Sequence, residues 1–379
     1  MTEEDFRTTC IALLRSSYDL SDTSEPQASV FAFRQALDLF DLFVRDINED
    51  SAGVFFAKIV PFLIKYINTC VLHMTAEALA RWSIDDVEYA TLTIMHSCNT
   101  LVSTSVTGYT TVAKWLDGNL LATLLVWLHE LRVFSSRRLH PGLFATAERT
   151  VTIMISATTS FLTYRSVNFR AVRQLKAIRD AGHLQNFDRR SSSSIIADFL
   201  HLEQQASAIA VHLNEFLQVC SDVPCSAKQC RRKMKPHAKR VRQWRWCSRC
   251  HVATYCCERC QESDWLDGHR ENCRRQLDAY HGLSYPPSNL DREFIRFLVQ
   301  SDMSSRKNTF RGTSMRSLRP MIVEYNINYW PLAFRMTEAT TKEKIEHRDR
   351  GGKPDETFVN IKLPCGPVLS LAVSESNFL

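Results

Sequence analysis

CSRCHVATYCCERCQESDWLDGHRENC, residues Cys247–Cys273, is the part of this chain whose chemistry can be recognised from its sequence. It lies within Cys220–Cys273, which holds nine of the chain's thirteen cysteines. The potential metal ligands here, in chain order, are Cys225, Cys230, Cys247, Cys250, Cys256, Cys260, His269 and Cys273. Consecutive pairs are separated by four, two, three and three residues, so both side chains of a pair can reach one ion without straining the backbone.

Eight ligands are enough for two four-coordinate ions, and this mixture of sulfur and imidazole is typical of zinc. A site closed by four protein ligands has no position for water or substrate, so the sequence predicts two structural Zn2+ ions. Cys257 is an alternative to Cys256 as a ligand, and Cys220 and His237 are further candidates. The plainer alternative is that these cysteines are free and buried. Four isolated cysteines are expected to be packing residues: Cys10, Cys70, Cys98 and Cys365.

The cysteine-rich segment, residues 219–275, resembles a MYND-type zinc finger. The similarity lies in Tyr255 before the fifth ligand, the Cys260-Gln261 step, Trp265 and the His269-x3-Cys273 ending. The first pair, with four intervening residues, is similar to a variant of fungal MYND proteins. Two departures from the family pattern are the sixteen residues between the second and third ligands and the three residues between Trp265 and His269.

The resemblance implies a cross-brace, in which the first and third ligand pairs bind one ion and the second and fourth pairs bind the other. One site would consist of Cys225, Cys230, Cys256 and Cys260. The other would consist of Cys247, Cys250, His269 and Cys273. From the spacing alone, two sequential sites are equally compatible with the sequence.

The resemblance also implies that the finger docks protein partners through short proline-containing peptides. The matching positions are Gln261 and Trp265, which are four residues apart and share one face of a helix. An exposed tryptophan beside an amide can stack on proline and hold an extended peptide. The alternative role of Trp265 is packing against the metal loops as a small core. Cys257 stands where the family often has a serine.

A basic insert, residues 228–245, carries nine Lys and Arg and no acidic residue, whereas the net charge of the whole chain is +6. Its charge, with Trp244 at its end, predicts an alternative function as a nucleic-acid-associated regulator. It is also similar to a nuclear-import patch. The plain alternative is a solvated charged loop.

The remaining sequence predicts a mainly α protein with three parts: a helical domain (1–218), the finger (219–275) and an α+β region (276–379). Helices are predicted near 51–73, 85–104, 118–134, 142–163, 169–181 and 194–219, with Pro61 kinking or splitting the first, and another at 291–301. The helical domain resembles an irregular armadillo or HEAT array, although it has no fixed repeat period. Strand-like runs at 321–336 and 358–373 predict a small antiparallel element.

The start of the chain lacks a secretion signal, and its uncharged runs are shorter than the roughly 20 residues that span a bilayer. We therefore expect an intracellular protein of the nucleus or cytoplasm, without a membrane role. Some MYND proteins are SET-domain methyltransferases, but the glycine-rich cofactor motif of that alternative is absent, as are P-loop, GxSxG and HExxH motifs. The sequence therefore predicts a binding protein and not an enzyme.

Overall fold

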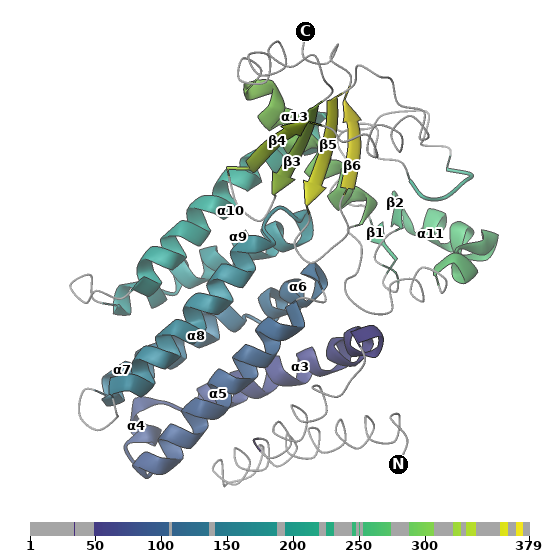
Figure 1. Ribbon diagram of the computed structural model, residues 1–379. Helices are drawn as coiled ribbons and strands as arrows, with labels where there is room; N and C mark the ends of the chain where they lie inside the picture. Colours follow the sequence, from purple (N-terminus) through teal and green to yellow (C-terminus); the bar gives the residue numbers. More distant parts are fainter. Residues whose placement is uncertain are drawn as a thin grey trace. The chain divides into compact units, whose positions relative to one another are not determined.

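The computed structural model describes the greater part of the chain. The described residues are 34, 49–105, 108–135, 141–187, 194–219, 225–230, 245–247, 250, 253–273, 288–306, 321–326, 331–338, 357–362 and 369–373. Within them the chain is mostly helical, with one four-stranded sheet and one short hairpin (Figure 1). The predicted mainly α class with a small sheet is therefore confirmed.

The described elements follow one another from a helical region into the cysteine-rich segment and then the sheet. The helices are α3 (Glu49–His73), α4 (Ala76–Leu79), α5 (Ile84–Ser105), α6 (Tyr109–Asp117), α7 (Leu120–Ser135), α8 (Pro141–Ser160), α9 (Arg165–Asp180), the 3-10 turn η2 (His183–Asn186), α10 (Ser194–Val219), α11 (Glu258–Asp264), the π-helical turn η5 (Trp265–His269) and α13 (Asn289–Ser305). The strands are β1 (Arg245–Trp246), β2 (Thr254–Tyr255), β3 (Met321–Asn326), β4 (Ala333–Glu338), β5 (Thr357–Lys362) and β6 (Leu369–Val373).

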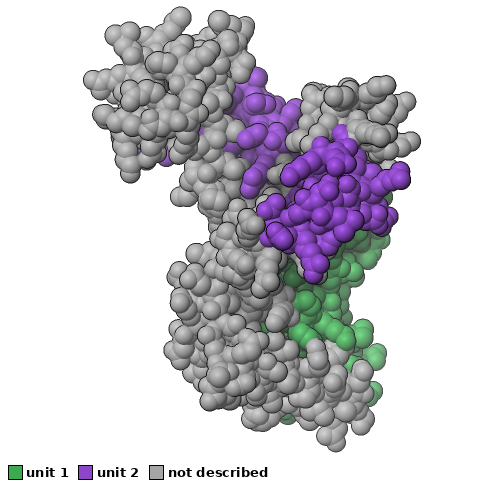
Figure 2. All heavy atoms as spheres, turned by 90° about the vertical axis from the view of Figure 1, so that its right-hand side faces the viewer, with its two compact units in different colours: residues 1–159, 166–207, 278–284 green, residues 160–165, 208–277, 285–379 purple. Residues whose placement is uncertain are grey.

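The chain divides into two compact units, which Figure 2 colours separately. Unit 1 comprises residues 1–159, 166–207 and 278–284, and unit 2 comprises residues 160–165, 208–277 and 285–379. The cysteine-rich segment and the sheet both belong to unit 2. These units are defined by compactness alone, so the domain boundaries predicted after residues 218 and 275 stay a prediction.

Unit 1 is built around buried helices. Leu124 and Trp127 of α7 are fully buried, and α7 is apolar around most of its circumference, as a helix enclosed by others must be. Helix α3 packs against α5 and α7. Its Asn68 donates from Nδ2 to the Gly118 carbonyl (2.9 Å) and accepts from the Thr123 hydroxyl (2.7 Å). These bonds satisfy a polar side chain between helices and fix the turn that precedes α7.

The helical prediction was wrong about a split at Pro61 and about α6. Helix α3 runs unbroken from Glu49 to His73, so Pro61 does not split it, and the alternative of a kink stays a prediction. Pro61 lies on the exposed side, where water can satisfy the carbonyl that proline leaves unpaired, while Val60 and Leu63 stay buried. The second error is α6, which was not predicted. It begins after Gly108 and buries Trp115 and Leu116 in the core.

The sheet of unit 2 has the strand order β4-β3-β5-β6. Its two hairpin pairs, β3–β4 and β5–β6, are antiparallel, but the central pair, β3 and β5, is parallel. The purely antiparallel prediction is therefore wrong, because the chain crosses over after β4 and returns beside β3. Val323 lies opposite Val359 and Tyr325 opposite Ile361, and all four are buried on one face. Helix α13 supports this unit through Asp302, which accepts from the Tyr325 hydroxyl (3.1 Å).

None of the helices that the structure describes combines the length and the apolar character needed to span a bilayer.

Candidate metal centre

The cysteine-rich segment brings eight side chains together in two groups of four. Group one consists of Cys225, Cys230, Cys256 and Cys260, and group two of Cys247, Cys250, His269 and Cys273. Within each group the ligand atoms all lie within 4.8 Å of one another. The groups alternate along the chain and correspond to the two sets that the MYND resemblance implies. Each group could hold a metal ion.

Group one is assembled from a turn, a strand end and a helix. The turn that carries Cys225 and Cys230 is closed by a bond from the Cys230 N–H to the Ala227 carbonyl (3.2 Å). Cys256 follows β2 directly, and Cys260 lies in the first turn of α11. The Cys256 sulfur is 3.6 Å from the Cys230 sulfur and 3.6 Å from the Cys260 sulfur.

Group two is assembled around the β1–β2 hairpin and the end of η5. Cys247 follows β1, and its N–H donates to the Ala253 carbonyl (2.9 Å); Cys250 belongs to the same group. The Cys247 and Cys273 sulfurs are 3.7 Å apart, and Nε2 of His269 is 3.7 Å from the Cys250 sulfur. All four members are buried.

These separations fit tetrahedral zinc. Four sulfurs at about 2.3 Å from one ion lie about 3.8 Å apart, and a sulfur and an imidazole nitrogen lie about 3.6 Å apart. The observed 3.6–3.7 Å contacts match both values. They are far longer than the roughly 2.05 Å of a disulfide. The donor set and its spacing are therefore compatible with two metal sites.

Burial raises the pKa of three cysteine thiols in the two groups. The pKa of Cys256 is raised to about 12, and the pKa values of Cys260 and Cys273 are raised as well, chiefly because burial disfavours the thiolate. Neighbouring sulfurs act in both directions: Cys247 raises the pKa of Cys273, for example, whereas a hydrogen bond with Cys260 lowers that of Cys256. A bound divalent cation reverses this balance, because it attracts the thiolate charges that otherwise repel one another.

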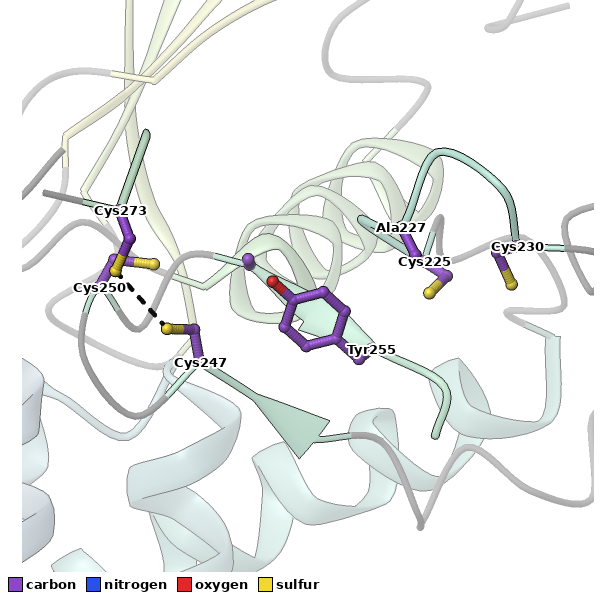
Figure 3. Close-up of a cluster of buried hydrophobic side chains, with 8 residues drawn as sticks. Cys225, Ala227, Cys230, Cys247, Cys250, Tyr255 and Cys273 are labelled. Carbon is purple, nitrogen blue, oxygen red and sulfur yellow. Dashed lines mark hydrogen bonds between the residues drawn. The ribbon is translucent and has the colours of Figure 1, made fainter. Parts of the chain in front are cut away.

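Tyr255 lies between the two groups. Figure 3 shows its ring with Cys225 and Cys230 on one side and Cys247, Cys250 and Cys273 on the other. The residue is fully buried and forms part of the same core as these cysteines. The only other members of this core among the described residues are Ala227 and Ala253, so it contains little apolar material of its own.

Of the alternative ligands, the structure describes only Cys257. Its sulfur lies 4.0 Å from the Cys256 sulfur, and the residue precedes α11 in an extended conformation. It belongs to neither group of four. Cys220 and His237 lie outside the described residues, as do the isolated Cys10 and Cys365. The isolated Cys70 and Cys98 are buried among the helices of unit 1, as predicted.

Gln261 and Trp265 lie one helical turn apart, because the Trp265 N–H bonds to the Gln261 carbonyl. Trp265 is partly buried: it packs against the cysteine core, and its ring lies 5.9 Å from that of His269. Gln261 is also partly exposed. The neighbouring Leu266 has 84% of its surface exposed. The packing role considered for Trp265 is therefore present, and the residue as a whole is only partly buried.

Sequence reasoning did not identify a polar network beside group two. The Tyr255 hydroxyl donates to Oδ2 of Asp264 (2.9 Å), and the same oxygen lies 3.8 Å from Nδ1 of His269. Asp264 is only 8% exposed. The signal in the sequence was weak: three acidic residues lie between Cys260 and His269, namely Glu262, Asp264 and Asp267, and acidic residues on a short helix are usually solvated.

Of the basic insert, the structure describes only residues 228–230 and 245. Lys228 is exposed, and Arg245 lies in β1 with its guanidinium 3.2 Å from the Glu258 carboxylate. Both partners of that pair are more than half exposed, so it contributes little to stability. The remainder of the insert lies outside the described residues, and its predicted roles stay predictions.

The helix of the cysteine-rich segment is kinked in the π-helical turn η5, where Gly268 has non-helical backbone angles. Gly268 in this turn has φ 110°, a conformation that residues with a side chain rarely adopt. We expect Gly268→Ala to destabilise the metal-loaded segment by about 1–2 kcal/mol through backbone strain. We expect no additional steric clash, because a Cβ at this position has no neighbouring atom within 4 Å.

Hydrogen exchange of residues 253–273 measures this effect. The matched control is Asp267→Ala, an exposed neighbour in the same turn, which should change protection by less than about 0.5 kcal/mol. Equal effects of the two substitutions would show that the positive φ of Gly268 is not required.

No family model, curated protein or solved structure matches this chain.

Proposed function

We propose that this protein is a zinc-binding protein–protein interaction module of the MYND type. It carries two structural Zn2+ ions and docks short, proline-containing segments of partner proteins in a regulatory complex. It acts inside the cell, in the nucleus or the cytoplasm. The helices of residues 49–219 serve as a scaffold of the armadillo or HEAT kind.

The observation that carries the proposal is the pair of closed four-ligand groups. Each has a complete tetrahedral donor set, and group two is buried throughout. Such sites have no open coordination position for a water or a substrate, so their metal stabilises structure and performs no reaction. A metal centre of this kind indicates a binding module, and its function must lie on the surface that it holds in place.

The surface that best suits peptide docking lies on α11 and its continuation. Gln261 and Trp265 are neighbours on one turn, and the cysteine core fixes the indole by packing against one part of it. A rigid, partly exposed tryptophan can stack on a proline ring, and the adjacent amide can hydrogen-bond to an extended backbone. Leu266 adds an exposed apolar side chain beside them.

We expect Trp265→Ala to weaken the binding of a proline-containing peptide by about 2 kcal/mol, which is roughly 30-fold, because it removes the stacking platform. A library of fluorescent proline-containing peptides, read by anisotropy against the full chain, measures this. Zinc content is measured on the same samples, because Trp265 also packs on the metal core.

Gln261→Ala tests the same surface without removing a core contact, and it should also weaken binding. Glu262→Ala is the matched control, since Glu262 is the exposed neighbour of Gln261 on the same helix. Docking at this surface is refuted if Trp265→Ala and Gln261→Ala both keep two zinc ions and bind every peptide as tightly as the unmodified protein does.

A further inference from the structure

The polar network of Tyr255, Asp264 and His269 connects the two metal groups. The Tyr255 hydroxyl donates to Asp264 over 2.9 Å, and the Asp264 carboxylate faces Nδ1 of His269 at 3.8 Å. The opposite nitrogen of the same ring, Nε2, faces the sulfur of Cys250. The Tyr255 and His269 rings meet edge to face, with centroids 6.0 Å apart. The orientation of His269 is thus set by groups outside its own site.

These outside groups are positioned by group one. Tyr255 immediately precedes Cys256, and Asp264 follows Cys260 by one helical turn on α11. A metal ion that binds Cys256 and Cys260 therefore fixes both ends of the backbone that presents the Tyr255 hydroxyl and the Asp264 carboxylate. His269, which those two groups contact, is a member of group two.

Because Asp264 is buried, loss of its polar partners would leave an unpaired carboxylate that destabilises the folded segment. Asp264 is 8% exposed, and an ionised carboxylate at such a site requires polar partners. The structure provides a hydrogen bond from the Tyr255 hydroxyl and places the Nδ1 edge of His269 nearby at 3.8 Å, a contact longer than a hydrogen bond. When Nδ1 carries the proton, Nε2 keeps the lone pair that a metal needs. Partners of this kind orient metal-binding histidines, and their loss typically weakens metal binding 10- to 100-fold.

We propose that Asp264, supported by Tyr255, is a positioning residue that couples the two metal sites. An ion in group one orders the Tyr255–Asp264 pair, which in turn holds His269 ready for the ion in group two. The proposal rests on the zinc binding proposed above. It predicts that the affinity of group two for metal depends on whether group one is filled, and that Asp264 transmits this dependence.

The test begins with Asp264→Asn in the full, zinc-loaded chain. We expect group two to lose zinc to a chelator at a 10- to 100-fold lower chelator concentration than in the unmodified protein, with group one shifted by less than threefold. Cobalt(II) in place of zinc identifies the site that empties, because a site of four thiolates and a site of three thiolates and one imidazole differ in absorption. Tyr255→Phe, which keeps the ring and removes only the hydroxyl, should produce a smaller shift in the same direction. Glu262→Gln, an exposed change on the same helix, should produce none.

A double-mutant cycle tests the coupling itself. Cys225→Ser disables group one and should weaken metal binding at group two in the unmodified background, but it should have little further effect when Asp264→Asn is present.

The 15N shifts of the His269 ring should also move toward the other tautomer in Asp264→Asn, a change that mere loosening of the fold does not produce. Equal loss of metal from both sites in Asp264→Asn, or additive effects in the cycle, would overturn the proposal. An unmodified chain without zinc would instead overturn the proposed function.

Discussion

Removal of the metal will unfold the cysteine-rich segment and leave the helices of residues 49–187 folded. The segment has almost no apolar core without its ligands, since Ala227, Ala253 and Tyr255 are the other buried members that the structure describes. Structural zinc sites contribute about 10–16 kcal/mol each in small fingers, whereas a buried methylene contributes about 0.8 kcal/mol. These three side chains, together with the partly buried Trp265 that packs against them, cannot replace such a contribution. The helices, in contrast, surround fully buried residues such as Trp127.

Hydrogen exchange with mass spectrometry, before and after treatment with a zinc chelator, measures this difference. Amides of residues 253–273 should lose their protection, and amides of α5 and α7 should keep theirs. Added zinc should restore protection, which separates metal loss from irreversible damage. Protection of residues 253–273 that survives complete metal removal would contradict a structural role for the metal.

The second large effect is expected at two adjacent cysteines. Cys256→Ser should reduce the metal content from two ions to one, because the Cys256 sulfur lies 3.6 Å from the sulfurs of both Cys230 and Cys260. Cys257→Ser should keep two ions, because Cys257 belongs to neither group of four. Native mass spectrometry of the full chain counts the ions directly.

Cys98→Ala is the matched control for this pair, since it removes a buried cysteine of unit 1 that no metal group contains. It should keep two ions. The opposite result, with one ion in Cys257→Ser and two in Cys256→Ser, would assign the ligand to Cys257. Two ions in both variants would show that either sulfur can complete the site.

The spacing of cysteines predicted which side chains could bind metal, but it did not predict how they group. Both interleaved and sequential pairing place the partners Cys247 and Cys250 together, so short-range spacing is equally compatible with each. The grouping depends on the β1–β2 hairpin, which places Tyr255 between the two sets. Only the family resemblance implied the interleaved sets. The Asp264 contact could not be predicted, because it depends on where a helix points after Cys260.

For the fold, too, the sequence predicted local structure but not how distant elements pair. Apolar residues at helical spacing predicted most of the helices of residues 49–219, because this signal is local and repeats over several turns. Helix α6 was missed because it is only nine residues long and follows a glycine turn. Alternation predicted strands near 321–336 and 358–373, but not that β3 and β5 run parallel. The residues of a strand do not indicate which strand it pairs with across a long connection, or in which direction that strand runs.

The interleaved ligand groups also define where this chain tolerates grafting. Cys230 belongs to one group and Cys247 to the other, so the sixteen residues between them leave one closed site and arrive at the next. Both attachment points are candidate metal ligands, and β1 directly precedes the second of them. Doubling the length of a connection costs only about 0.6 kcal/mol of closure entropy. A foreign peptide or an epitope spliced between residues 231 and 244, which leaves β1 intact, should therefore be displayed without loss of either ion.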